Sequence, residues 1–253
     1  MPIYTRELSD NDLISLINIC DTLGDHPLYA VIPEGLDTCA IEGLFPKLQF
    51  VEFAPSYFES IAGYNRLMLD VEFYEVFSSY EYILVAQLDT YIFRDDLELW
   101  CRKGFDYVGA PFLRRDIYDA PVIRQLITVY QHVCRKLHHR THFDRYGRVG
   151  NGGFSLRRVA SHLKALSECP LVVHQYAVTH NRQGLFEEDT FWAMEIPWFK
   201  YPTEAEAMLF AYNKYPELSY ARTGGQLPFG CHGWTKPDYG RFWKKHKLIP
   251  MMK

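Results

Sequence analysis

The clearest pattern in the chain is a run of apolar residues at positions 82–88 that leads directly into a lone carboxylate, Asp89. Only Gln87 interrupts this run, and residues 91–93 continue the apolar pattern beyond the aspartate. A continuous apolar run of this length is typical of a strand that is buried on both faces. Because ligands of open α/β sheets bind at the carboxyl ends of such strands, Asp89 stands where a site is expected.

The carboxylate of Asp89 needs a partner if it is buried at the end of this strand. A buried charge is costly unless a cation compensates it, and a divalent metal ion is a common partner for aspartate. The alternative is that Asp89 caps the turn that follows the strand. Both interpretations of this residue remain open at this point.

Strand and helix patterns alternate ahead of this run. Apolar segments at residues 28–32 and 48–53 predict strands, and residues 13–23 predict a helix that begins after a capping-box-like start at Ser9. Residues 61–77 carry apolar side chains at helical spacing and predict one further helix. This alternation predicts βαβ units, so the expected fold class is α/β with a mostly parallel sheet flanked by helices.

The rest of the chain continues the same alternation. Residues 1–5 are too few for a full strand and are expected to form the tail of a first one. Strands are predicted at residues 105–110 and 154–156, helices at 94–101, 123–137 and 157–166, and a loop at 174–184.

Composition narrows the class of protein. The 253 residues are 48% hydrophobic and carry a net charge of −4, which fits one globular domain over residues 1–253 and disfavours nucleic acid as a partner. The six cysteines are scattered without a CxxC pair, as expected of reduced thiols in a cytoplasmic protein. The chain shows neither a signal peptide nor an apolar 18-residue run, so at most peripheral membrane association is expected.

A glycine-rich turn surrounds Asn151. Gly150, Gly152 and Gly153 would let the backbone adopt positive φ or approach a ligand closely, and the spacing matches neither a dinucleotide fingerprint nor a P-loop. We therefore expect Asn151, Gly152 and Gly153 to shape a pocket for sugar hydroxyls rather than phosphates.

Three consecutive acids, Glu187, Glu188 and Asp189, stand at the start of a predicted helix. Favourable interaction with the helix dipole is the structural explanation, but three acids exceed what capping needs. One of them is a candidate catalytic base. Asp189 lies about 200° around the helix from Phe191, so it ranks first if that aromatic ring packs into the core, and Glu188 ranks second.

His232 lies between glycines and aromatic residues, where it is either a buried, hydrogen-bonded histidine or a metal ligand. His138 and His142 have the i, i+4 spacing of zinc ligands, but no cysteine or carboxylate nearby completes a set, so a solvated basic loop is expected. Asp95 and Asp96 suit the first turn of the short helix that follows them.

Taken together, these motifs resemble a GT-A-type glycosyltransferase, and more closely a bacterial glycosyltransferase-like family catalogued as a domain of unknown function. The resemblance covers nearly the whole chain. It is carried by five motifs in order, namely residues 63–65 (GYN), 87–89 (QLD), 107–111 (YVGAP), 151–155 (NGGFS) and 232–234 (HGW).

The resemblance implies a metal-assisted site. GT-A enzymes generally hold Mn²⁺ or Mg²⁺ through an Asp-x-Asp motif, of which Asp89 keeps the first position while Tyr91 replaces the second. Glycogenin-like retaining transferases complete the metal site with a C-terminal histidine followed by G-x-x-K-P. In this chain His232 matches the metal ligand, and Lys236 would contact the donor diphosphate.

The implied activity is transfer of a sugar from a nucleotide-sugar, with UDP as the expected carrier, to a glycan or glycolipid acceptor. Tyr4 would reach the nucleotide base. Trp234, Trp192 and Tyr91 would either stack on sugar or base faces or pack in the core. The acidic helix start favours inversion of the anomeric centre, whereas the histidine motif favours retention. The alternatives are a catalytically inactive carbohydrate- or nucleotide-binding module, and a sugar nucleotidyltransferase, which would need a glycine-rich phosphate loop near the amino terminus that the sequence lacks.

Overall fold

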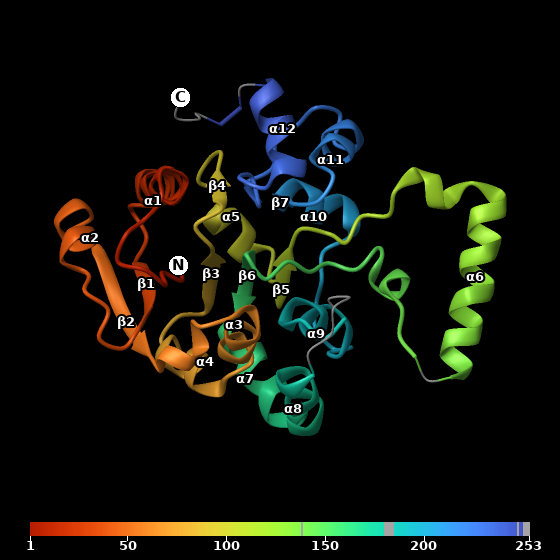
Figure 1. Ribbon diagram of the computed structural model, residues 1–253, viewed down its shortest axis with the longest axis horizontal. Coiled ribbons are helices and arrows are strands. Elements are labelled where there is room, and N and C mark those ends of the chain that lie inside the picture. The colour runs from red at the N-terminus through yellow and green to blue at the C-terminus, as the bar shows by residue number, and fades with distance from the viewer. Residues whose placement is uncertain (138, 180–184, 247, 250–253) are drawn as a thin grey trace.

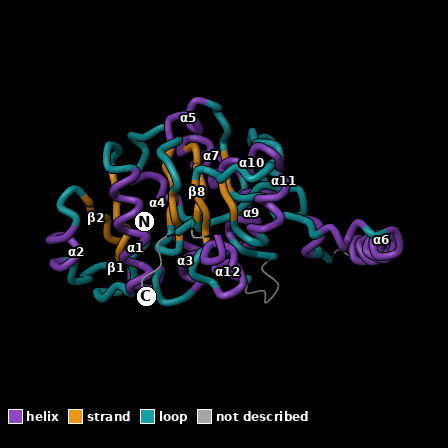
Figure 2. Tube along the Cα trace, turned by 90° about the horizontal axis from the view of Figure 1, so that it is seen from above, coloured by secondary structure: helices purple, strands orange, loops and turns teal. Residues whose placement is uncertain are grey.

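The computed structural model describes residues 1–137, 139–179, 185–246 and 248–249 (Figure 1). The strands form a central layer with helices on both sides, and one helix, α6, projects from this body in both views (Figures 1 and 2). The strands are β1 (Leu28–Pro33), β2 (Leu48–Phe53), β3 (Tyr82–Ala86), β4 (Thr90–Ile92), β5 (Tyr107–Gly109), β6 (Phe154–Arg158), β7 (Ala211–Tyr212) and β8 (Gly230–His232).

The helices connect and cover these strands. They are α1 (Asp10–Thr22), α2 (Cys39–Leu44), α3 (Ile61–Met68), α4 (Val71–Val76), α5 (Leu97–Arg102), α6 (Pro121–Lys136), α7 (Val159–Glu168), α8 (Pro170–Val178), α9 (Glu188–Met194), α10 (Glu204–Phe210), α11 (Pro216–Arg222) and α12 (Pro237–His246), with single 3₁₀ turns η1 (Pro55–Tyr57), η2 (Asp116–Asp119) and η3 (His142–Arg145). Within the described ranges, no helix combines the length and the apolar composition that crossing a bilayer requires.

The direction of the strands departs from the mostly parallel sheet that the sequence predicts. The pairs β1–β2 and β7–β8 are parallel, as expected, but β6 runs antiparallel to both β3 and β5, and β4 is antiparallel to β8. An apolar run predicts a buried strand without stating its direction. The chain enters β6 after the long excursion from β5 through α6, a connection that allows either direction.

Strand β3 contacts a core on each face, as predicted, but only Val85 and Ala86 are fully buried, and residues 82–84 are partly exposed. Leu84 and Ala86 pack into one core, which includes α1, α5 and alternate residues of β6. Ile83 and Val85 face a second core, which is built by α3, α4, α7 and α9. The side chains of a strand alternate between its faces, so one apolar run serves both cores.

Local signals determine several helix ends. The predicted capping box is present at α1, where the Ser9 side chain accepts from the amide of Asp12 and the Asp12 carboxylate accepts from the amide of Ser9. The single helix predicted over residues 61–77 is instead two helices, because Asp70 leaves helical geometry and caps α4 by accepting from the amide of Glu72 at 2.9 Å. The loop predicted over residues 174–184 is wrong up to Val178, which ends α8, and residues 180–184 lie outside the described ranges.

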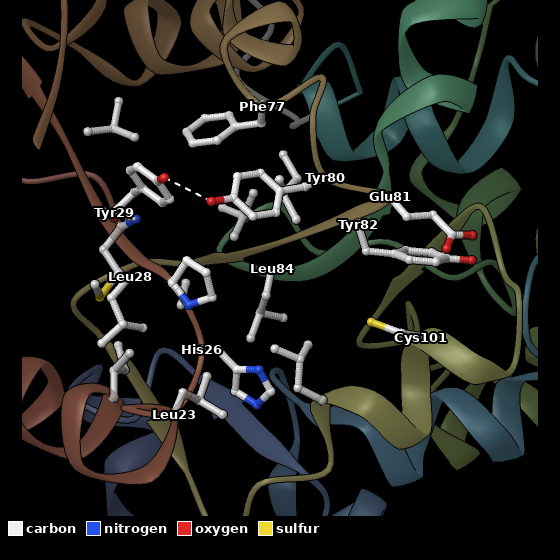
Figure 3. A pocket seen from close by; sticks show the side chains of 18 of the residues that line it. Leu23, His26, Leu28, Tyr29, Phe77, Tyr80, Glu81, Tyr82, Leu84 and Cys101 are labelled. Carbon is white, nitrogen blue, oxygen red and sulfur yellow. Dashed lines mark hydrogen bonds between the residues drawn. The ribbon is translucent and has the colours of Figure 1, made fainter. Parts of the chain in front are cut away.

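Residues 1–3 take the place expected for the tail of a first strand. Pro2 forms a parallel bridge with Val31, and the amine of Met1 donates to the carbonyl of Tyr29 at 2.7 Å. In the described part of the chain no ladder joins β1 to β3, and a cavity of about 440 Å³ lies between them. Figure 3 shows its largely apolar lining, with the hydroxyls of Tyr29 and Tyr80 hydrogen-bonded at 2.9 Å.

We expect the replacement of Asp70 by alanine to lower the free energy of unfolding by about 1–3 kcal/mol. The substitution removes both the cap of α4 and the carboxylate that accepts a hydrogen bond from the Tyr57 hydroxyl. Asp70→Asn is the matched control, because asparagine caps helices as well as aspartate. Urea unfolding curves of the two variants test this, and equal stability of Asp70→Ala and wild type would contradict the assignment.

Candidate active site

A polar cleft of about 540 Å³ lies at the ends of β3, β6 and β8, beside the start of α9. Side chains up to 235 positions apart in the sequence, from Tyr4 to Tyr239, line this cleft. Most of the residues predicted to carry function line this cleft, namely Tyr4, Asn151, Gly152, Gly153, Glu188, Asp189, His232 and Lys236.

Asp89 lies directly behind the cleft wall, in the turn between β3 and β4. Its carboxylate contacts His232, with 2.9 Å between Oδ1 and Nε2, and Lys236, with 3.6 Å between Oδ2 and Nζ. Burial opposes the charge of Asp89, but the hydrogen bond and charge of His232 together with Lys236 hold the pKa of Asp89 below its usual value. His232 is thus buried and hydrogen-bonded, which was one of its two interpretations, and its role as a metal ligand stays a prediction.

Backbone pairing fixes this arrangement. Thr90, which follows Asp89, is the ladder partner of His232 in β8. Asp89 and His232 therefore cannot separate without breaking the strand pair. The carbonyl oxygen of Asp89 also accepts from the amides of Gly233 and Trp234, at 2.9 and 3.3 Å. The segment that follows β8 is therefore folded around Asp89.

The residues around Asp89 suit a divalent ion that takes most of its ligands from a bound molecule and water. The protein offers the Asp89 carboxylate and Nε2 of His232, with Oε1 of Gln87 at 3.0 Å from the same nitrogen. No cluster of three histidine, cysteine, aspartate or glutamate side chains with metal-binding geometry occurs among the described residues. Oxygen and imidazole ligands fit Mn²⁺ or Mg²⁺ chemically.

The glycine turn makes room for protein side chains. A Cβ atom at Gly153 would lie 2.0 Å from Nε2 of His232, and one at Gly152 would lie 1.8 Å from Oε1 of Glu188. Neither glycine has positive φ. The expectation that these glycines serve a close approach of ligand is therefore corrected in part, because His232 and Glu188 occupy the space.

Asn151 shapes this turn. The Asn151 side chain is buried, and its Oδ1 accepts from the amides of Gly153 and Phe154 at 3.1 and 3.0 Å. The carbonyl of Gly153 in turn accepts from the amide of Gln87 at 2.8 Å, which joins the turn to the end of β3. At least the amide oxygen of Asn151 is thus committed to the backbone rather than to a ligand.

A buried ion pair lies beneath the turn. Arg157 and Glu188 are 0% and 2% exposed in their side chains, and Nη2 is 3.1 Å from Oε2. Arg157 also donates to the hydroxyl of Tyr74 at 2.9 Å and to Oγ of Ser155 at 3.0 Å. Burial raises the pKa of Glu188 to about 7, and the charge of Arg157 opposes this shift.

The sequence did not identify Arg157 as part of the site. Residues 157–166 were predicted to form a helix, whereas Arg157 belongs to β6. The available signal was an arginine inside an apolar strand pattern, because a buried arginine requires an anionic partner.

Asp189 lines the cleft beside Glu188. Burial raises the pKa of Asp189, whereas Arg145 and the hydroxyl of Thr190 favour its charged form. Burial and Asp189 also raise the pKa of Glu187, against the charges of Arg145, Lys214 and Lys236. The cleft therefore holds acids and cations together, and the sequence had not singled out Arg145 or Lys214.

Two predicted stacking residues lie away from the cleft. Trp234 is fully buried, and its indole donates to Oγ of Ser15 at 2.9 Å, so its predicted contact with donor is wrong for this structure. Tyr91 packs beside Phe93, with 5.4 Å between ring centroids, and does not line the cleft. Both residues stabilise the core under α12, because aromatic rings at these positions meet apolar neighbours.

Tyr4 does line the cleft, in front of the ring of Phe58 at 6.1 Å. Burial and the charge of Asp89 raise the pKa of Tyr4 to about 12, so its hydroxyl is neutral at physiological pH. A neutral phenol beside a cleft can both stack and donate a hydrogen bond.

The other polar motifs have structural partners. Asp95 contacts His26 at 2.9 Å, and Asp96 pairs with Arg94, in line with their predicted place at the start of α5. His142 lies in η3 against the ring of Phe143, while His138 lies outside the described residues.

We expect the replacement of Gly153 by alanine to destabilise the fold by roughly 1–3 kcal/mol, because the new methyl group would overlap the imidazole of His232. Gly43→Ala in α2 is the control, since a Cβ atom there meets nothing within 4 Å. Because alanine is more favourable than glycine inside a helix, this variant should not be destabilised. Urea unfolding of both variants would check this, and unchanged stability of Gly153→Ala would argue against the close packing.

The pKa of Glu188 predicts a pH effect. Because its pKa is raised from 4.5 in the unfolded chain to about 7, the folded state binds more protons between these values. The contribution of Glu188 to stability therefore falls as the pH rises through this window, by about 3 kcal/mol at most, and is constant above it. The slope of unfolding free energy against pH should become less negative in Glu188→Gln. Identical slopes in the two proteins would contradict the assignment.

Comparison with known proteins shows which folds this chain resembles. A search of curated protein sequences finds no match to the chain. Among solved structures, the galactosyltransferase LgtC in complex with donor and acceptor sugar analogs has a TM-score of 0.52 at 12% sequence identity, over 100% of this chain and 98% of that one. An active-site mutant of LgtC has a TM-score of 0.51 at 15% identity, with the same coverage.

Mouse xyloside xylosyltransferase 1 in its apo form is similar as well, with a TM-score of 0.50 at 13% identity over 99% of both chains. These likenesses confirm the α/β, GT-A-like fold that the motifs predict. At the level of sequence, residues 47–232 match the family described as "Protein of unknown function (DUF5672)". The chain belongs to this family, and its fold is that of the GT-A glycosyltransferases.

Proposed function

We propose that the cleft transfers a sugar from a nucleotide-sugar, with UDP as the favoured carrier, to a glycan or glycolipid acceptor. The observation that carries this proposal is that Asp89, behind the cleft wall, contacts His232 and Lys236, which line the cleft together with Asp189. A cation-binding group and an acid on one cleft are what a diphosphate leaving group and an acceptor hydroxyl require. LgtC, which shares the fold, was crystallised with donor and acceptor sugar analogs.

In this mechanism the acceptor oxygen forms a bond to the anomeric carbon while the bond from that carbon to the diphosphate oxygen breaks. The leaving diphosphate keeps the electron pair, and Lys236 stabilises its negative charge. Mn²⁺ or Mg²⁺, held by Asp89 and His232, would supply further charge stabilisation. Asp189 accepts the proton of the acceptor hydroxyl, and the anomeric configuration is inverted.

Asp189 suits the role of base better than Glu188. Both acids line the cleft and have pKa values raised by burial, but the carboxylate of Glu188 is already held by the buried Arg157. A raised pKa makes a carboxylate a stronger proton acceptor. Asp189 therefore ranks first and Glu188 second.

The second candidate is a binding module without catalysis. It is favoured by one observation, that Tyr91 stands where GT-A enzymes carry the second aspartate and packs into the core. Such a module would bind a nucleotide-sugar without releasing the nucleotide.

Incubation with Mn²⁺ and a panel of nucleotide-sugars, followed by measurement of released nucleotide, separates the two candidates. We expect turnover of one donor, and a decrease in kcat of about 10²–10⁴ in Asp189→Asn with donor binding nearly unchanged. Asp21→Asn, on the exposed face of α1, is the control. Binding without turnover would favour the module, and retention of anomeric configuration by NMR would remove Asp189 as the base.

Calorimetry of UDP with and without Mn²⁺ tests the metal. We expect Mn²⁺ to strengthen UDP binding in the wild type. It should have no effect on UDP binding in Asp89→Ala and His232→Ala, because these side chains are placed to share one ion. His142→Ala, outside the cleft, should behave as the wild type. Equal UDP affinity in all samples would exclude the proposed metal site.

A further inference from the structure

Helix α6 stands apart from the body of the protein, as both views show (Figures 1 and 2). None of its residues is buried. Its inner side lies against η3, where the Gln131 amide donates to the Asp144 carboxylate at 2.9 Å and Tyr130 meets the ring of Phe143. The outer side has no partner among the described residues.

An apolar stripe runs along this outer side. Its residues are spaced by four, three and four positions, which places them on one face of a helix. The exposed fractions are 71% for Val122, 64% for Leu126, 58% for Val129 and 49% for Val133. Leu137, which follows α6, extends the stripe and is also more than half exposed. A solvated helix is expected to carry polar side chains on such a face.

The charges of α6 are all positive. Arg124, Arg135 and Lys136 are exposed, His132 accompanies them, and no acidic residue occurs between Pro121 and Lys136, although the whole chain carries a net charge of −4. One acid outside the helix, Asp144, contacts Arg135 at 3.3 Å. At about 100° per residue, Arg124 and Arg135 lie on the polar side opposite the stripe, whereas Lys136 lies beside it.

We propose that α6 is a membrane-docking helix, which lies in the surface of an anionic lipid bilayer with its apolar stripe in the acyl boundary. An exposed apolar stripe beside cations and without acids is the pattern of an interfacial helix. A bilayer with anionic headgroups satisfies both features at once. Pairing with α6 of a second copy would cover the stripe but would bring no acid to Lys136 beside it, since α6 contains none, so the membrane is the better partner.

The position of α6 links this docking to the cleft. The segment that enters α6 begins at Phe112 and Leu113, and the segment that leaves it contains Arg145 and Tyr146, all of which line the cleft. A bilayer that holds α6 would therefore lie near the cleft rim. Resting on the proposed function, this placement favours an acceptor that is itself anchored in the membrane, such as a glycolipid.

Flotation of the full-length protein with lipid vesicles tests docking without any need for activity. We expect binding to vesicles of phosphatidylcholine and phosphatidylglycerol at least 10-fold tighter than to phosphatidylcholine alone, and weaker binding at high salt. The double variant Arg124→Gln, Lys136→Gln should lose roughly fivefold in affinity for each cation removed. Leu126→Gln with Val133→Gln should lose on the order of 10-fold or more, because the stripe no longer enters the acyl boundary.

Leu171→Gln is the matched control, since Leu171 is an even more exposed leucine on another helix, α8, and this variant should bind as the wild type. Circular dichroism confirms that each variant is folded. Absence of binding, equal binding to both kinds of vesicle, or unchanged binding by the α6 variants would overturn the proposal. A wild-type dimer in sedimentation equilibrium that Leu126→Gln with Val133→Gln dissociates would assign the stripe to self-association instead. Vesicle binding by a protein without transferase activity would leave the inference intact.

Discussion

The buried ion pair of Arg157 and Glu188 is the interaction on which the cleft depends. It ties the start of α9 to the end of β6, and Arg157 continues the connection to α4 through Tyr74. Two charges with almost no exposure are costly to desolvate, so the pair gives little net stability, but loss of either partner would leave the other charge buried and uncompensated. Its main consequence is positional, because Glu187 and Asp189 flank Glu188 in sequence and are held at the cleft with it.

The same pair explains the glycine turn. Glu188 approaches the backbone so closely that residue 152 cannot carry a Cβ atom, and His232 imposes the same condition on residue 153. The turn is therefore packed closely between two buried side chains that both line the cleft, Glu188 and His232. Packing at this distance leaves few alternative positions for either side chain. An active site gains preorganisation from such constraints, since its groups need no rearrangement when a substrate binds.

Charged side chains and unpartnered apolar side chains lie in different regions of the molecule. The cleft gathers acids and cations that modify one another's pKa values, as shown by the opposing effects of Arg145, Lys214 and Lys236 on Glu187. The apolar cavity between β1 and β3 has no comparable cluster of charges, and α6 carries its apolar stripe into solvent. The chemistry of transfer and the attachment to a surface would thus depend on separate elements, which single substitutions can distinguish.

The sequence by itself determined the local elements and the end of the central strand. Apolar periodicity predicted β2 and β3, and the capping box predicted the start of α1, because these signals act between neighbouring residues. The resemblance to GT-A glycosyltransferases also implied that Asp89, His232 and Lys236 belong together. Only the tertiary structure decided the direction of β6, the burial of Trp234 and the pairing of Arg157 with Glu188. Each of these depends on which distant segment packs against the residue, and a pattern of nearest neighbours carries no information about that.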